Sequence, residues 1–149
     1  MQLSANFYLA EMVTSQTALR RGIPNDPGPE EVAALKLLCQ KVLQPVRDHF
    51  AVPVTISSGY RSPRLNTAIG GSATSQHCFG EAADFTIAGL SNLEVCKWME
   101  RHLNYDQLIY EFGEEGWVHC SFSADRMRNM ELTAKRIGGR VRYLDGFVR

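Results

Sequence analysis

The stretch SQHCFGEAADFTI, residues 75–87, joins a polar loop to a strand and decides where this chain can place reactive side chains. From residue 82 onward its side chains alternate, so that Ala83, Phe85 and Ile87 share an apolar face while Asp84 lies on the other face. Asp84 comes seven residues after His77, a separation of ~23 Å in an extended chain. The two can meet only if the chain turns back, and a glycine stands between them at the point where that turn is needed.

Further strands are expected on both sides of this stretch. Val52–Ser57 is a β-branched run bounded by turn residues. Gln107–Phe112 and Trp117–Phe122 flank the turn Gly113–Gly116 and predict a hairpin. In the second of these runs His119 lies on the polar face, as Asp84 does on its own strand.

Helical patterns precede and interrupt these strands. Ser4–Arg21 has two weak patterns, with Ser15 as a cap. Pro29–Phe50 is the longest pattern, and Pro45 inside it predicts a kink or an early end because proline has no backbone N–H. A capping-box pattern opens a further helix at Ser91–Leu103. The predicted class is α+β, with a small antiparallel sheet packed against helices.

Length predicts one domain, because 149 residues is the ordinary size of a single hydrophobic core. Within residues 1–149 we expect a helical N-terminal part at 1–50, a core carrying the reactive residues at 51–123 and a basic C-terminal segment at 134–149. The polar segment Gly59–Gln76 is expected to be a long loop, and loops of that length usually carry function.

Composition excludes several classes of protein. Sixteen Lys and Arg residues balance sixteen Asp and Glu residues, so no bulk positive field favours nucleic acid. No apolar run approaches the ~20 residues of a membrane helix, and no basic and apolar leader indicates export. The four cysteines form no C-x-x-C pair and are expected to be reduced.

His77, Asp84 and His119 are the candidate metal ligands, because imidazole and carboxylate suit Zn²⁺ and three protein ligands leave one position open. Simpler explanations exist. A single histidine in a strand is more often a surface or hydrogen-bonded residue, and Asp84 could be a salt-bridge partner or a strand-end cap. A structural four-ligand site made of His77, Cys78, His119 and Cys120 is disfavoured, because adjacent strand residues point to opposite faces.

These residues resemble a known family. The run 75–84 matches the S-x-H-x-x-G-x-A-x-D signature of the zinc D-Ala-D-Ala carboxypeptidase family, and Trp117-Val118-His119 matches its later W-x-H element. The similarity extends upstream to residues 58–63 and 70–72. The family includes D,D-dipeptidases of vancomycin resistance and phage L-alanyl-D-glutamate endolysins, and shares its fold with the Hedgehog signalling domain. The resemblance implies that His77, Asp84 and His119 bind zinc.

The resemblance is less direct for the catalytic base. Many relatives have an acidic residue three positions before the last histidine, where this chain has Gly116. Glu111 matches the variant of the small phage-type and Hedgehog-like members and is preferred over Glu115. Glu114 and Glu115 are expected to be solvated residues at the tip of the turn. Glu111 could instead be a plain cross-strand charge partner.

Arg61 aligns with the family arginine that holds the substrate and the developing oxyanion, a role that suits a planar guanidinium, although a surface arginine is the alternative. Ser75 and Gln76 could bond the substrate backbone or orient a metal ligand. Trp117 is expected beside the substrate, although a tryptophan in a hairpin more often packs in a core.

The resulting hypothesis is a monomeric zinc peptidase that cleaves a peptide bond in bacterial peptidoglycan, without nucleic-acid or membrane partners. The bond would be D-Ala-D-Ala or L-Ala-D-Glu. The alternative is an inactive zinc-containing module that binds peptide or cell wall. Cytoplasmic synthesis followed by action on the wall, as a phage lysis enzyme or within a virion, is expected. The basic segment 134–149 could attract an anionic wall or could be an ordinary last strand.

Overall fold

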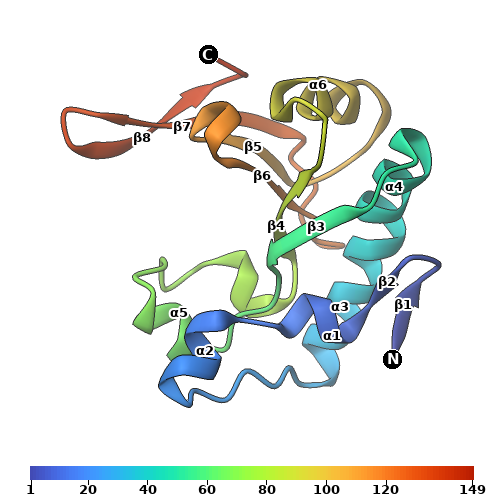
Figure 1. The fold of residues 1–149 in the computed structure, drawn as a ribbon, viewed down its shortest axis with the longest axis vertical. Coiled ribbons are helices and arrows are strands. Elements are labelled where there is room, and N and C mark those ends of the chain that lie inside the picture. The colour runs from blue at the N-terminus through green and yellow to red at the C-terminus, as the bar shows by residue number, and fades with distance from the viewer.

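The computed structural model describes residues 1–149 and is built around a six-stranded sheet with the strand order β3-β4-β6-β5-β7-β8 (Figure 1). A separate two-stranded sheet lies near the N-terminus. The strands are β1 (Gln2–Ser4), β2 (Phe7–Tyr8), β3 (Val54–Ser58), β4 (Ala82–Ile87), β5 (Gln107–Glu111), β6 (Trp117–Ser121), β7 (Met130–Ile137) and β8 (Arg140–Asp145). The predicted α+β class is confirmed, and so is the hairpin of β5 and β6.

The prediction of a purely antiparallel sheet is wrong at one pair, because β5 and β7 run parallel. The reason lies in the order of the strands. Both edges of β6 are occupied, by β4 and β5, so the next strand cannot pair with β6; the chain reverses after β6, and β7 pairs with the free edge of β5. Since β6 is antiparallel to β5, this second reversal makes β7 parallel to β5.

Helices cover one face of the large sheet and leave the centre of the other face open. The helices are α1 (Leu9–Val13), α2 (Gln16–Arg21), α3 (Pro29–Leu38), the π-helix η1 (Cys39–Leu43), α4 (Gln44–Phe50), α5 (Pro63–Ala68), the 3₁₀ turn η2 (Gln76–Phe79), α6 (Asn92–His102) and the 3₁₀ turn η3 (Gly113–Glu115). The core joins apolar residues of α3, η1, α4 and α6 to Phe85 on β4 and Val118 on β6. Because strand residues alternate, Asp84 and His119 belong to the open face.

The helix boundaries that depend on capping agree with the sequence. The Ser15 side chain accepts a hydrogen bond from the Ala18 N–H at the start of α2, and Gly22 ends that helix in the left-handed region at φ 62°. The Ser91 side chain caps α6 by accepting from the Glu94 N–H. Local side-chain chemistry therefore sets these boundaries.

Three segments differ in detail from the sequence prediction. Phe7–Tyr8 is a short strand instead of the start of a helix. The helical run ahead of Pro45 widens into the π-helix η1 before α4 begins, since Pro45 offers no N–H to the regular ladder. The expected loop Gly59–Gln76 contains α5, whose start is signalled by the Ser62 cap.

The basic segment 134–149 supplies the end of β7 and all of β8, so the last-strand interpretation is the one that the structure supports. No helix in the structure combines the length and the apolar character needed to cross a membrane.

Candidate metal centre and cleft

Strand register brings the first two candidate ligands together. Asp84 on β4 is the direct partner of His119 on β6 in the antiparallel ladder. Facing residues of an antiparallel pair project from the same side of the sheet. The His119 Nδ1 atom lies 2.8 Å from the Asp84 Oδ1 atom, and both residues are buried.

His77 reaches the same point from outside the sheet, through the turn η2. The Ser75 hydroxyl accepts a hydrogen bond from the His77 N–H, and Gly80 closes the turn in the left-handed region at φ 72°. A Cβ on Gly80 would collide with the backbone oxygen of Glu31 on α3. The glycine expected between His77 and Asp84 is therefore required both for the turn and for the close approach of α3.

The ring of His77 is held in one orientation. Its Nδ1 atom lies 2.7 Å from the Gly59 carbonyl oxygen, which can only accept, so Nδ1 carries the proton. The Nε2 atom is then left with its lone pair and lies 3.4 Å from Asp84 Oδ2. A backbone carbonyl that fixes the tautomer in this way is a common support for a metal-binding histidine.

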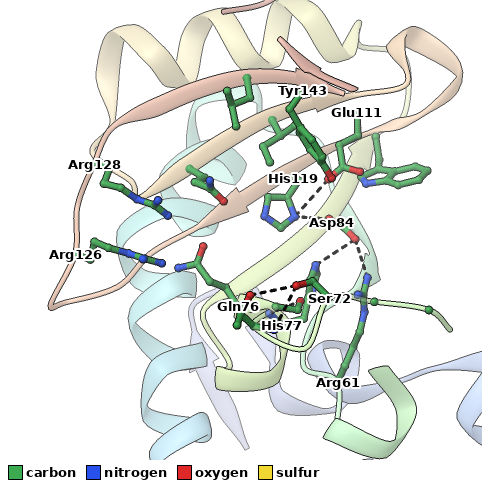
Figure 2. Close-up of a pocket in the computed structure, with 18 residues that line it drawn as sticks. Arg61, Ser72, Gln76, His77, Asp84, Glu111, His119, Arg126, Arg128 and Tyr143 are labelled. Carbon is green, nitrogen blue, oxygen red and sulfur yellow. Dashed lines mark hydrogen bonds and ion pairs between the residues drawn. The ribbon is translucent and has the colours of Figure 1, made fainter. Parts of the chain in front are cut away.

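One ligand atom from each of His77, Asp84 and His119 lies within 4.8 Å of the other two (Figure 2). Two imidazoles and a carboxylate that face one point form a donor set that fits Zn²⁺, with room for a fourth ligand on the open side of the cleft. Cys120 points into the core instead, and Cys78 is outside the group, so a four-ligand site with both cysteines does not form.

The carboxylate of Asp84 and the neutral ring of His77 suit a cation, whereas His119 holds a proton more firmly and would release it when a metal ion binds. Burial alone would raise the pKa of Asp84, but the hydrogen bond from His119 and the closeness of the two imidazole rings outweigh it and hold that pKa well below the usual range. Burial lowers the pKa of His77, which keeps its ring neutral. For His119 the carboxylate of Asp84 overcomes the effect of burial and raises the pKa.

Glu111 lies beside this group at the end of β5. Its Oε1 atom is 3.7 Å from His119 Nδ1. Burial raises the pKa of Glu111 to about 7, although the neighbouring His119 acts in the opposite direction. A carboxyl group with this pKa can exchange a proton near neutral pH, as a general base or acid must.

Gly116, the position where many relatives have the acid, has no room for a side chain. Any Cβ there would collide with the carbonyl oxygen of Glu111 across the turn. Glu115 is exposed at the same turn and does not line the cleft. Of the two acids weighed from the sequence, Glu111 alone faces the metal group.

Glu114 is exposed at the turn, as expected, but it also has structural partners that the sequence did not indicate. Its carboxylate accepts hydrogen bonds from the backbone N–H groups of Asn92 and Leu93 at the start of α6, and from the hydroxyl of Tyr110. The residue fastens the β5–β6 turn to the helix. A carboxylate at a helix N-terminus is favoured by the helix dipole, a signal that becomes visible only when the turn and α6 are seen to be neighbours.

Arg61 enters the cleft on the side opposite Glu111. Its Nε atom donates to Ser58 Oγ at 3.0 Å, and its Nη2 atom lies 3.5 Å from Asp84 Oδ2. These contacts aim the guanidinium at the metal group while the side chain keeps 16 % of its surface exposed. A fixed cation with free N–H groups can bind a carboxylate or an oxyanion at this position.

Ser75, Gln76 and Trp117 also line the cleft, but each has a structural partner. Ser75 caps η2. The Gln76 amide donates to Asp106 Oδ2 at 2.9 Å. The Trp117 ring packs against Phe112, and its indole N–H is buried without a hydrogen-bond partner.

The cleft has a volume of about 620 Å³ and includes residues that sequence reasoning missed. Arg128 and Arg126 lie at one end, where the fully buried carboxylate of Asp106 holds them. Tyr143 on β8 forms part of the wall near Glu111 (Figure 2). No motif marks these residues, because Arg126 and Arg128 are placed by their contacts with Asp106, and Tyr143 is placed by the pairing of β5 with β7 and of β7 with β8.

A buried group of two histidines and one aspartate, open to a cleft and next to a carboxyl group of raised pKa, has the composition of a catalytic metal site. Comparison with protein families gives the same class. The model of the family Peptidase M15 matches residues 5–121, and the chain belongs to this family. The resemblance to the zinc D-Ala-D-Ala carboxypeptidases is thereby confirmed, and the family assignment makes the chain a metallopeptidase. No curated protein matches the sequence. The match ends at Ser121, so β7 and β8 lie outside the matched residues.

Proposed function

We propose that this protein hydrolyses a peptide bond in the stem peptides of bacterial peptidoglycan, with zinc held by His77, Asp84 and His119. The observation that carries the proposal is the convergence of three ligand atoms within 4.8 Å in an open cleft, together with Glu111 next to them. The M15 family supplies the substrate class. The bond is of the D-Ala-D-Ala or the L-Ala-D-Glu type.

Zinc bound to this group would polarise the scissile carbonyl and acidify a water molecule. Glu111 accepts the proton of the attacking water at its carboxylate and delivers it to the leaving amine. Its raised pKa suits both steps, because a general base that is too acidic would not take the proton. Arg61 binds the substrate from the opposite side of the cleft and stabilises negative charge on the carbonyl oxygen.

The proposed substrate lies in the cell wall. We therefore also propose that the protein acts there, as a phage lysis enzyme or as part of a virion, with one copy of the chain sufficient for the reaction because every residue named above comes from a single chain.

The test uses the purified protein, its metal content and a set of defined muropeptides. Loaded protein is expected to contain one zinc per chain and to release new peptide termini, which mass spectrometry identifies, and a chelator is expected to stop the release. The termini distinguish the two bond types.

Glu111→Gln is expected to lower turnover by roughly 10²–10⁴-fold without loss of zinc. Glu115→Gln is the matched control, since this acid sits in the same turn region but outside the cleft, and should keep full activity. A protein that binds zinc and muropeptides tightly without forming product would contradict the proposal and favour a binding module.

A further inference from the structure

Sheet register places Tyr143 in the same transverse row as the proposed base. Trp117 on β6 pairs with Glu111 on β5, Glu111 pairs with Ala134 on β7, and Ala134 pairs with Tyr143 on β8. Partners in neighbouring strands project from the same face. Tyr143 therefore emerges on the cleft side, two strands from Glu111.

The residue that lies between Tyr143 and Glu111 in this row is small. Ala134 is fully buried and carries only a methyl group, so no side chain of β7 stands between the Tyr143 ring and Glu111. Two strand spacings amount to ~10 Å between backbones, a distance that a tyrosine and a glutamate reaching toward each other can bridge. In Figure 2 the ring of Tyr143 extends from β8 toward Glu111, and both residues line the cleft.

The hydroxyl of Tyr143 is free to bind a ligand. Two other tyrosines of the sheet region use their hydroxyls internally, Tyr105 toward Glu131 and Tyr110 toward Glu114. The Tyr143 hydroxyl makes no hydrogen bond within the chain, and the residue keeps 59 % of its surface exposed.

Tyr143 is a hydrogen-bond donor throughout the neutral pH range. Partial burial raises its pKa, and the carboxylates of Glu111 and Asp84 raise it further by opposing a negative phenolate. Glu111, in the same row, offers only acceptor oxygens when it is ionised. Trp117 cannot supply a donor to the cleft, because its N–H is buried.

We propose that Tyr143 is a further catalytic residue, whose hydroxyl donates a hydrogen bond to the scissile carbonyl oxygen as negative charge develops on it. The inference rests on the proposed function and extends it. Arg61 lies on the opposite side of the metal group, so the oxygen is bound from two sides, by a fixed charge and by a neutral donor. Tyr143 lies on β8, outside residues 5–121 that the family model matches.

The experiment compares Tyr143→Phe with Tyr8→Phe, which removes the hydroxyl of another exposed tyrosine on the separate N-terminal sheet. Both zinc-loaded variants are assayed for kcat and KM on the muropeptide that the wild type cleaves. Calorimetry measures the affinity for a phosphinate dipeptide, which imitates the tetrahedral transition state. Zinc affinity and the unfolding midpoint serve as checks on structure.

Tyr143→Phe is expected to lower kcat by roughly 10- to 100-fold with KM changed less than about twofold, because the bond forms only as charge develops. The phosphinate affinity should fall by a similar factor, while zinc affinity and unfolding stay at the wild-type values. Tyr8→Phe should match the wild type in every measurement.

An unchanged kcat in Tyr143→Phe, or a rise in KM alone, overturns this inference and leaves the proposed function intact. A zinc-loaded wild type that cleaves no muropeptide overturns the proposed function itself, and this inference with it.

Discussion

The two walls of the cleft are built in different ways. The loop wall, residues Gly59–Gly80, is irregular and is held by side-chain bonds to the backbone, such as Asn66 Nδ2 to the Ser72 oxygen at 2.7 Å and His77 Nδ1 to the Gly59 oxygen at 2.7 Å. The strand wall, strands β5, β7 and β8, is positioned mainly by backbone ladders. The loop wall thus depends on particular residues, and the strand wall depends on register.

The two walls supply different kinds of side chain to the site. His77 and Arg61 come from the loop wall, where individual bonds fix single side chains. Glu111 and Tyr143 come from the strand wall, where one ladder aligns a whole row. We therefore expect changes in the loop wall to reduce metal affinity and stability together, and changes in the strand wall to alter proton and charge chemistry with little effect on the metal.

Gly80→Ala should give the largest effect on stability. The variant combines a positive φ with a collision against the Glu31 backbone, so the free energy of unfolding should fall by about 2–5 kcal/mol and zinc should bind more weakly. Gly70→Ala is the control, because Gly70 also has a positive φ but open space around it, and should cost only about 1 kcal/mol. Urea unfolding and zinc titration check both, and equal losses in the two variants would contradict the role of the α3 contact.

Asp106→Asn should give the next largest effect, because Asp106 joins the two walls. Asp106 is fully buried. Its carboxylate accepts hydrogen bonds from Arg128 Nε at 2.6 Å and from the Gln76 amide. Replacing it should lower the free energy of unfolding by about 2–3 kcal/mol near neutral pH, less than for a fully buried pair because Arg128 is partly exposed.

The pH dependence of that loss has a definite sign. Burial opposes ionisation of Asp106, but the bonds from Arg128 prevail and lower its pKa. Because the pKa of Asp106 is lower in the folded state, its contribution to stability is complete above the pKa of the unfolded chain, about 3.9. This contribution is lost as the pH falls through the pKa of the folded state. The difference between wild type and Asp106→Asn should therefore shrink below about pH 4 in urea unfolding. A difference that grows on acidification would contradict this assignment.

Glu111→Gln should change stability in the opposite direction, because it removes a buried charge. In metal-free protein the pKa of Glu111 is raised to about 7 by burial, so its ionisation destabilises the fold increasingly from about pH 4 and fully above about pH 7. The variant should be more stable than the wild type by about 3 kcal/mol above neutral pH and nearly equal at about pH 4. Unfolding of chelated protein tests this, and a variant that is less stable at high pH would show that the carboxylate is structurally required.

Short-range signals in the sequence were sufficient for much of the site. The alternation at residues 82–87, the glycine at position 80 and the hairpin pattern around Gly113–Gly116 are local, so His77, Asp84, His119 and Glu111 could be placed on the correct elements. Their meeting point follows from the pairing of β4 with β6.

Other features depend on which segments become neighbours, and no local pattern carries that information. Glu114 resembles any polar turn residue until α6 is seen to begin against it. The parallel pairing of β5 with β7, together with the pairing of β7 with β8, brings Tyr143 into the cleft. The basic composition of the last residues gave no indication of that pairing.

The position of β8 at the outer end of the sheet also bears on solubility. An edge strand has unpaired backbone groups that can recruit a strand from another molecule. On β8, Arg142 faces Lys135 of β7 directly, and Arg140 stands two pairs further along. These like charges cost some cross-strand stability, but they make the margin of the sheet repel a second copy of itself and so protect the protein from aggregation through β-strand addition.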